Sequence, residues 1–190
     1  MKLLIRFLCF SAVAITMLSC STIQFQNVNN DSNDLLIWST NHKLSEADFL
    51  APIPEKSADR SGNIYLSMPV QFQKMHLLLP TNIQVNACMS KKVSWFNSKK
   101  AVPGTMDYFQ LLFDSYEIHA RLLKKKISEA DLNPINPTET IGKLANEVQT
   151  AASTSVAQIE TETERGTNKV ELIRWRAEID QKLLELDAFK

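Results

Sequence analysis

The sequence of 190 residues is poor in the residues on which several kinds of functional site depend. Four glycines leave no glycine-rich loop to hold a phosphate and no Gly-x-Ser-x-Gly turn to present a nucleophilic serine. Basic and acidic residues balance at 21 each, so no basic surplus is present to bind nucleic acid. The three histidines, His42, His76 and His119, are scattered, and no two have the spacing of paired metal ligands. A metal site built from these histidines and Glu117 is therefore only a minor alternative.

A long apolar segment is also missing. The main apolar run covers residues 7–18, which is 12 residues, and it follows the basic Lys2 and Arg6. A membrane-spanning helix needs roughly 20 apolar residues, whereas a short run behind a basic start is typical of a signal peptide. The run ends in Met-Leu-Ser-Cys at positions 17–20, which resembles a bacterial lipobox. We predict that residues 1–19 are a lipoprotein signal peptide and that Cys20 carries lipid. The alternative is an ordinary secretory signal followed by a chance cysteine.

Lipidation of Cys20 accounts for the low cysteine content. Cys9 would leave with the signal peptide, so Cys88 would be the only unmodified cysteine and no intramolecular disulfide could form. We expect Cys88 to be a buried structural thiol, because no activating group is evident beside it in the sequence. More than one acyl chain on Cys20 would anchor the protein stably to the cell envelope. No aspartate follows Cys20, so we expect the outer membrane, with the domain facing the periplasm.

The remaining chain divides into a tether and one domain. Residues 20–34 are polar and rich in Asn, Ser and Asp, which is typical of a flexible tether. Residues 35–190 have the length of a single domain. Loss of Lys2 and Arg6 leaves the mature chain with two more acidic than basic residues. The sequence thus predicts a domain of nearly neutral net charge that a short tether joins to Cys20.

Strand patterns are confined to the first half of the domain. Short apolar or alternating stretches predict strands at 35–38, 62–70, 72–79 and 83–89, and the stretch 93–96 would close the sheet. Residues 44–49 predict a turn of helix or a tight loop, and residues 80–82 predict a turn. We therefore expect a small antiparallel sheet.

Apolar residues at spacings of three and four predict three long helices in the second half. The first covers residues 106–127, with Phe109 and Leu112 facing the core. The second runs from about residue 139 to 163 with Thr138 as its N-cap, and the third covers residues 170–189 after an interruption at Gly166. Strands followed by helices predict an α+β fold.

Several short motifs are shared with a known bacterial family. Residues 43–49 read Lys-Leu-Ser-Glu-Ala-Asp-Phe and follow an apolar stretch that ends in Trp38, and Ser94-Trp95 precedes the first helix. The helical positions that match are Gln110, Phe113, Asp114, Glu117, Ala120 and Arg121, and those near the C-terminus are Glu162, Thr163, Gly166, Asn168, Lys169 and Trp175. In these motifs the chain resembles a bacterial domain of unknown function described as a predicted secreted zinc-dependent protease, with lipoprotein relatives in Bacteroidetes. The resemblance covers most of residues 35–190 and implies a zinc-peptidase-like fold.

The departures from that family fall on its catalytic groups. The resemblance places a His-Glu-x-x-His motif at residues 108–112, in which two histidines hold zinc and the glutamate is a general base. This chain has Tyr108 and Leu112 at the ligand positions and Phe109 at the base position. Arg165 stands where a later Thr-x-His-Gly segment has a histidine, and a guanidinium stays charged in proteins. The resemblance therefore implies a degenerate site with no zinc or other cofactor. We expect Tyr108 to be a half-buried core residue rather than a general acid.

The function expected from these features is binding rather than catalysis. We predict a lipid-anchored envelope protein whose inactive peptidase-like domain binds an envelope protein or a peptide, using the cleft that such a fold implies. One alternative is an active zinc-dependent peptidase or other hydrolase with a rearranged site. A second alternative is a structural lipoprotein without a specific ligand. The sequence predicts contact with the membrane through Cys20 and no nucleic-acid partner.

Overall fold

The computed structural model describes residues 34–73, 82–133 and 136–190. Small antiparallel sheets come first along the chain and three long helices follow, so the predicted α+β class is confirmed. In chain order the strands are β1 (Leu35–Ile37), β2 (Gly62–Asn63), β3 (Leu66–Ser67), β4 (Val70–Gln73), β5 (Asn82–Val85), β6 (Cys88–Ser90) and β7 (Trp95–Phe96). The long helices are α1 (Thr105–Glu129), α2 (Pro137–Glu162) and α3 (Lys169–Glu185). Four short 3₁₀ turns are η1 (Glu46–Asp48), η2 (Glu55–Ser57), η3 (Glu164–Gly166) and η4 (Asp187–Phe189).

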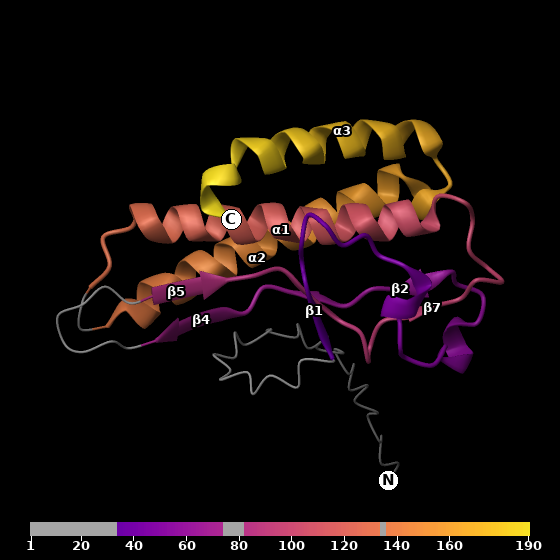
Figure 1. Ribbon diagram of the computed structural model, residues 1–190, viewed down its shortest axis with the longest axis horizontal. Helices are drawn as coiled ribbons and strands as arrows, with labels where there is room; N and C mark the ends of the chain where they lie inside the picture. Colours follow the sequence, from indigo (N-terminus) through magenta and orange to yellow (C-terminus); the bar gives the residue numbers. More distant parts are fainter. Residues whose placement is uncertain (1–33, 74–81, 134–135) are drawn as a thin grey trace, which may run out of the picture.

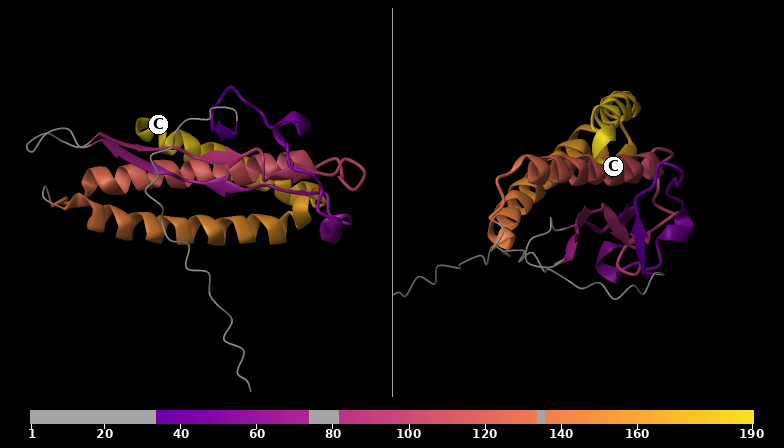
Figure 2. Two further views of the ribbon diagram at one scale, coloured as in Figure 1. Left: turned by 90° about the horizontal axis from the view of Figure 1, so that it is seen from below. Right: turned by 60° about the vertical axis from the view of Figure 1, so that its left-hand side comes forward.

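Helix α1 is the centre of the fold. It packs against α2 and α3, and strands β3 and β5 contact it as well. Figure 1 shows α3 on one side of α1 and the strands on the other, and Figure 2 shows the same order of layers from a second direction. Every residue from Tyr108 to Arg121 is buried as a consequence. A helix that is buried on all sides must satisfy its polar side chains inside the protein.

The predicted single sheet is wrong in detail, because the strands of the described residues form three separate groups. Strand β6 lies between β1 and β3, β2 pairs with β7, and β4 pairs with β5, all antiparallel. The stretch 83–89 was expected to be one strand, but it divides at Asn86 and Ala87 into β5 and β6, which pair with different partners. Residues 62–70 divide in the same way, and Pro69 cannot donate a ladder hydrogen bond between β3 and β4.

Other expectations for the strand half have mixed outcomes. The stretch 93–96 does not close a sheet that contains β6, because β7 pairs only with β2 among the described strands. The turn of helix expected within 44–49 is confirmed as η1. The expected strand 72–79 and the expected turn at 80–82 lie mostly outside the described residues, which include only β4 up to Gln73 and β5 from Asn82 onward.

The helix boundaries follow local chemistry. Asn136, and not Thr138, occupies the N-cap position of α2, because Pro137 is the first helical residue and a proline there needs no N–H partner. The expected break at Gly166 is confirmed, since η3 separates α2 from α3 with left-handed φ values at Glu164, Arg165 and Gly166. The third helix ends at Glu185 rather than 189 and is followed by η4.

Candidate functional site

The first half of α1 carries three of the four positions at which the resemblance places catalytic groups. Tyr108, Phe109 and Leu112 are exposed by only 2%, 1% and 3%. The prediction that Phe109 and Leu112 face the core is confirmed. The expected half-buried state of Tyr108 is wrong, because α2 and η3 pack against α1 where Tyr108 lies.

Phe109 lies in an aromatic cluster rather than beside an open site. Its ring centroid is 5.3 Å from that of Phe49, 6.5 Å from that of Phe96 and 5.2 Å from that of Tyr108. Gly62 in β2 allows the backbone to approach this cluster, because a Cβ atom there would lie 2.9 Å from the Phe109 ring and 2.8 Å from the Trp95 carbonyl oxygen. Tilted and edge-on rings at these separations attract one another, so the aromatic cluster around Phe109 stabilises the fold by packing.

Arg165 lies at the edge of the same region, although it is distant in sequence. Its Nη1 atom is 2.6 Å from Oε1 of Glu160, and its Nη2 atom donates to the carbonyl oxygen of Gly62 at 3.2 Å. Burial raises the pKa of Tyr108 to about 12; the carboxylate of Glu160 adds to this, and the charge of Arg165 opposes it. Tyr108 is therefore a neutral phenol at physiological pH, and Arg165 is a paired cation. Neither group offers a lone pair that zinc would select.

The described histidines do not form a metal site. His42 contacts Asp48, with 3.1 Å between Nε2 and Oδ2, and His119 donates from Nδ1 to the carbonyl oxygen of Ser115 at 2.7 Å. His76 lies outside the described residues. Within residues 34–73, 82–133 and 136–190, no three His, Cys, Asp or Glu side chains are grouped so that they could hold a metal ion.

A stripe of buried polar residues runs along another face of α1, at Gln110, Asp114, Glu117 and Arg121. Gln110 accepts a hydrogen bond from the backbone N–H of Leu44 at 2.8 Å and donates one to Asp114 Oδ1 at 2.8 Å. The same Asp114 oxygen accepts from the indole N–H of Trp38 at 2.7 Å, and the other carboxylate oxygen pairs with Arg176 of α3. Asp114 therefore joins the chain after β1 and helix α3 to α1.

The second half of this polar stripe contains a buried ion pair. Arg121 is 1% exposed, and its Nε atom donates to Glu117 Oε1 at 2.8 Å. Its Nη1 atom donates to the carbonyl oxygen of Leu183 at 2.8 Å, and the guanidinium carbon lies 5.3 Å from the centre of the Trp38 ring. Glu117 is therefore a buried residue that is salt-bridged to Arg121.

Cys88 is a structural thiol, as predicted. It is 3% exposed and free, and burial raises its pKa to about 11, with a further contribution from the charge of Glu117. A thiol with such a pKa is almost entirely protonated at physiological pH, so it is a weak nucleophile.

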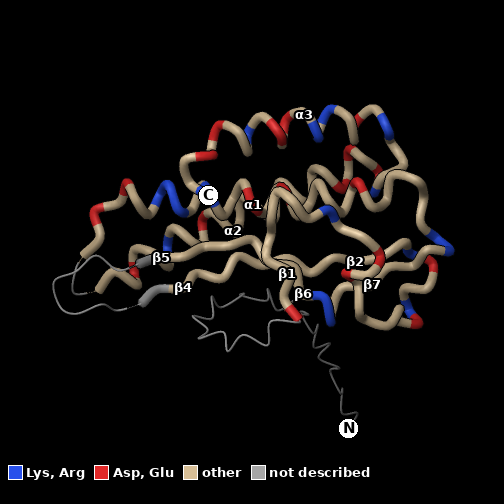
Figure 3. The backbone as a smooth tube through the Cα atoms, viewed as in Figure 1, with Lys and Arg blue, Asp and Glu red and all other residues tan. Residues whose placement is uncertain are grey.

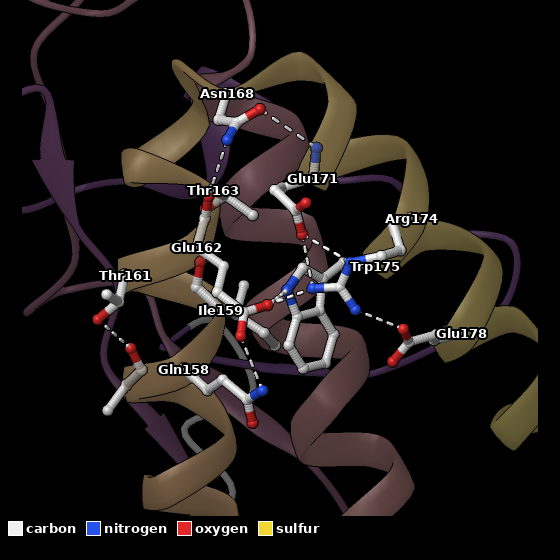
Figure 4. A network of polar contacts seen from close by, with 11 residues as sticks. Gln158, Ile159, Thr161, Glu162, Thr163, Asn168, Glu171, Arg174, Trp175 and Glu178 are labelled. Carbon is white, nitrogen blue, oxygen red and sulfur yellow. Dashed lines mark hydrogen bonds and ion pairs between the residues drawn. The ribbon is translucent and has the colours of Figure 1, made fainter.

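Four of the C-terminal residues that carry the resemblance belong to one network between α2 and α3, namely Glu162, Thr163, Asn168 and Trp175 (Figure 4). The indole N–H of Trp175 donates to Glu162 Oε2 at 2.9 Å, and Arg174 pairs with the same carboxylate. Asn168 caps α3 by accepting from the Glu171 N–H at 3.3 Å, while its own N–H donates to the Thr163 carbonyl at 2.9 Å. These residues hold a tight turn between α2 and α3.

That turn also contacts the start of α1 through two glycines. A Cβ atom on Gly104 would lie 2.2 Å from the carbonyl oxygen of Gly166, and one on Gly166 would lie 2.5 Å from the carbonyl oxygen of Gly104. Gly166 has a φ of 98°, a backbone conformation that is strained for a residue with a side chain. The close backbone contact fixes η3, and with it Arg165, against the N-terminus of α1.

A groove with a volume of about 370 Å³ lies between the N-terminal halves of α1 and α3. Its lining is mixed in charge and polarity and consists of Lys43, Asp107, Gln110, Leu111, Leu172, Ile173 and Arg176. Two of these residues, Gln110 and Arg176, are held in place by Asp114. None of the four degenerate-site positions lines this groove. Tyr108 and Leu112 lie instead on a neighbouring, buried face of α1.

Charges of both signs alternate along α3. Figure 3 shows acidic and basic segments interspersed along α3, and Arg174 alone pairs with Glu162, Glu171 and Glu178. Interspersed charges of this kind give a solvated face rather than a field that would concentrate a charged polymer.

Comparisons with protein-family models, curated proteins and solved structures give no match for this chain. Membership of the resembled family therefore stays a prediction. Among the helices of the described residues, none is long and apolar enough to cross a membrane. Cys20, the predicted lipidation site, and the tether up to residue 33 lie outside the described residues.

Sequence reasoning missed the groove and the connections of Asp114. Trp38, Asp114 and Arg176 come from three elements that no sequence spacing connects. The available signal was the recurrence of polar residues at 110, 114, 117 and 121, at spacings of three and four along the helix. Such a polar row on a central helix indicates that buried partners must exist, although it does not say which they are.

Proposed function

We propose that this protein is a lipid-anchored component of the bacterial cell envelope whose zinc-peptidase-like domain is catalytically inactive and acts as a binding module. The observation that carries the inactive state is the packing of Tyr108, Phe109 and Leu112 into the core. A catalytic zinc needs about three protein ligands and an open position for water. The three buried side chains provide neither, and Arg165 is engaged with Glu160 and the Gly62 carbonyl.

The proposed ancestry is supported by which residues lie close together. Tyr108 and Arg165 come from different helices, yet each is near Glu160, and the charge of Arg165 acts on the Tyr108 phenol. Proximity is what two former ligand positions would require. The matching polar residues Gln110, Asp114 and Arg121 also have structural roles that an inactive descendant would still need.

The proposed binding activity is supported by the groove between α1 and α3. Its volume of about 370 Å³ falls in the range of sites that hold small ligands or side chains. Lys43, Asp107 and Arg176 supply charges of both signs beside the apolar Leu111, Leu172 and Ile173. This mixture suits a short peptide segment, which carries an apolar side chain between polar backbone groups.

The anchor is tested by the Cys20→Ala substitution in cells that are labelled with a traceable fatty acid. We expect loss of acyl labelling and release of the protein from the membrane fraction, because the thiol is the proposed attachment point. The Cys88→Ala variant is the matched control and should remain labelled, because Cys88 is buried. Continued labelling of the Cys20→Ala variant would contradict the anchor.

The degenerate site is tested by restoring ligands. The variant Tyr108→His, Leu112→His and Arg165→His should bind zinc more tightly than the unmodified chain, and Phe109→Glu can then be added to restore the base. The control places an i,i+4 histidine pair at the exposed positions Glu147 and Ala151 of α2 and leaves Arg165 unchanged. Equal zinc affinity of the folded three-histidine variant and this control would contradict the proposed ancestry.

The groove is tested with a pair of substitutions on α3. Ile173 lines the groove and is 73% exposed, whereas Val170 lies on the same helix, is 74% exposed and does not line it. If short fluorescent peptides bind in the groove, Ile173→Asp should weaken their binding and Val170→Asp should leave it unchanged. Equal effects of the two substitutions would show that the groove is not the binding site.

A further inference from the structure

Three large apolar side chains are exposed at one end of the three-stranded sheet. Leu50, Tyr65 and Val93 are exposed by 53%, 57% and 52%. Isolated exposed apolar residues are common and need no explanation, whereas several that gather in one place indicate an interaction surface.

Backbone hydrogen bonds place these three residues around one turn, at residues 90–94. The N–H of Leu50 donates to the Lys91 carbonyl at 2.9 Å, and that of Ala51 donates to the Ser94 carbonyl at 3.0 Å. On the other side, the N–H of Tyr65 donates to Ser94 Oγ at 2.9 Å, and its carbonyl accepts from Ser90 at 3.0 Å. Val93 lies within the turn itself. We call Leu50, Tyr65 and Val93 the turn patch.

The described chain enters the domain at the turn patch. The N–H of Lys91 donates to the carbonyl oxygen of Asp34 at 2.8 Å, so the segment that leads back to Cys20 meets the domain beside residues 90–94. Figures 1 and 2 show that β1 begins on the side of the domain away from α3. A chain of the length between Cys20 and Asp34 reaches at most about 50 Å. A lipid on Cys20 would therefore hold the turn patch near the membrane surface.

Two lysines beside the turn patch, Lys91 and Lys92, are paired with carboxylates. Lys91 Nζ lies 3.8 Å from Asp48 Oδ1, and Lys92 Nζ lies 2.5 Å from Asp34 Oδ2. A membrane contact at this place would thus depend on apolar side chains rather than on anionic lipids. Tyrosine suits such a contact, because its ring is apolar and its hydroxyl is polar, as the lipid–water interface requires.

We infer that the turn patch rests on the interfacial region of the membrane that holds Cys20, with Leu50, Tyr65 and Val93 inserted among the lipid headgroups. This inference rests on the proposed lipid anchor. The tether keeps the effective concentration of the bilayer high, so a patch too small to bind a membrane alone is sufficient once the chain is anchored. In this orientation α3 and the groove face away from the bilayer and are open to a ligand from the periplasm.

The test uses the full lipidated chain in vesicles of a zwitterionic phospholipid. Single Val93→Cys and Leu50→Cys variants receive a spin label, and Val170→Cys is the control because it is 74% exposed on α3. The buried Cys88 is not expected to react. The labels' accessibility to oxygen, which enters lipid, is compared with accessibility to a water-soluble nickel chelate. We expect the ratio to shift toward oxygen at positions 93 and 50 relative to position 170, without dependence on salt.

Equal ratios at positions 93 and 170 in anchored protein would overturn the inference and leave the anchor intact. Shielding of position 93 from both reagents would overturn it as well, because a protein partner would then cover the patch. Failure of the anchor is measured separately, by continued acyl labelling of the Cys20→Ala variant. The two failures are therefore distinguishable.

Discussion

Two buried faces of α1 differ in whether they contain polar side chains. The face with Tyr108, Phe109 and Leu112 is packed with rings and an aliphatic side chain, and it is where the resemblance expects zinc ligands and a base. The polar stripe, at Gln110, Asp114, Glu117 and Arg121, is equally buried, yet its side chains have hydrogen-bond or ion-pair partners. The buried polar side chains of this helix are thus those that connect it to other elements of the fold.

The largest expected effect comes from the packed face. Phe109→Ala should lower the free energy of unfolding by about 3–5 kcal/mol, because it removes a fully buried ring and leaves a cavity among Phe49, Phe96 and Tyr108. Chemical denaturation of the two proteins measures the difference. Val170→Ala, at a residue that is 74% exposed, should change stability by less than about 0.5 kcal/mol. A similar small effect for Phe109→Ala would mean that this face is not a packed core.

A comparable effect is expected when the buried ion pair of the polar stripe is broken. Arg121→Met should cost about 3–5 kcal/mol, because the Glu117 carboxylate then stays buried without its partner. Replacing both residues, with Glu117→Leu added, should recover much of the loss. Lys126→Met, which breaks the exposed pair with Glu147, should cost less than about 1 kcal/mol. If the double variant were no more stable than Arg121→Met, the loss would not come from the unpaired carboxylate.

A smaller effect is expected at the start of the polar stripe. Asp114→Asn keeps an oxygen for Trp38 but loses the charge that pairs with Arg176, so we expect a loss of about 1–3 kcal/mol. Because Arg176 lines the groove, peptide binding should weaken in the same variant. A stable variant with unchanged binding would show that Asp114 does not organise the groove.

The smallest effect concerns pH. Burial lowers the pKa of His119 from 6.5, and the charge of Lys182 lowers the pKa further. The hydrogen bond to Ser115 raises the pKa, but it does not offset the other two effects. The unfolded chain therefore binds a proton at a higher pH than the folded one. Stability from this group is complete above the unfolded pKa of 6.5 and is lost as pH falls from there toward the folded pKa. His119→Gln should reduce the fall in unfolding free energy between about pH 7.5 and about pH 5. If the unfolding free energy of the His119→Gln variant fell as steeply with decreasing pH as that of the unmodified chain, His119 would not be the cause of the fall.

Sequence reasoning reached the helices more reliably than the strands. Spacings of three and four defined α1 to within two residues at each end, since this helix has no proline or glycine after Thr105. The strands are only two to four residues long, so each is too short to show a clear alternation of apolar and polar residues. Their ends are decided by pairing with segments that are distant in the sequence. The split between β5 and β6 at Asn86 and Ala87 depends on different partner strands, β4 for β5 and both β1 and β3 for β6, which no local pattern encodes.

For the candidate site, sequence reasoning identified the positions but not their surroundings. The apolar spacing of α1 correctly placed Phe109 and Leu112 in the core. The contacts of Arg165 with Glu160 and Gly62 depend on the left-handed turn at η3, and the groove depends on the docking of α3 against α1. Both are consequences of tertiary packing.

The central claim, that the packed face of α1 has replaced a catalytic site, is tested most directly by zinc content together with peptidase activity. The full unmodified chain is equilibrated with zinc and dialysed, and bound metal per chain is measured beside peptide cleavage with and without a chelator. We predict much less than one tightly bound zinc per chain and no chelator-sensitive cleavage, because Tyr108, Phe109, Leu112 and Arg165 offer no ligand set. One tightly bound zinc per chain with cleavage that the chelator abolishes would contradict the account and favour an active peptidase with a rearranged site.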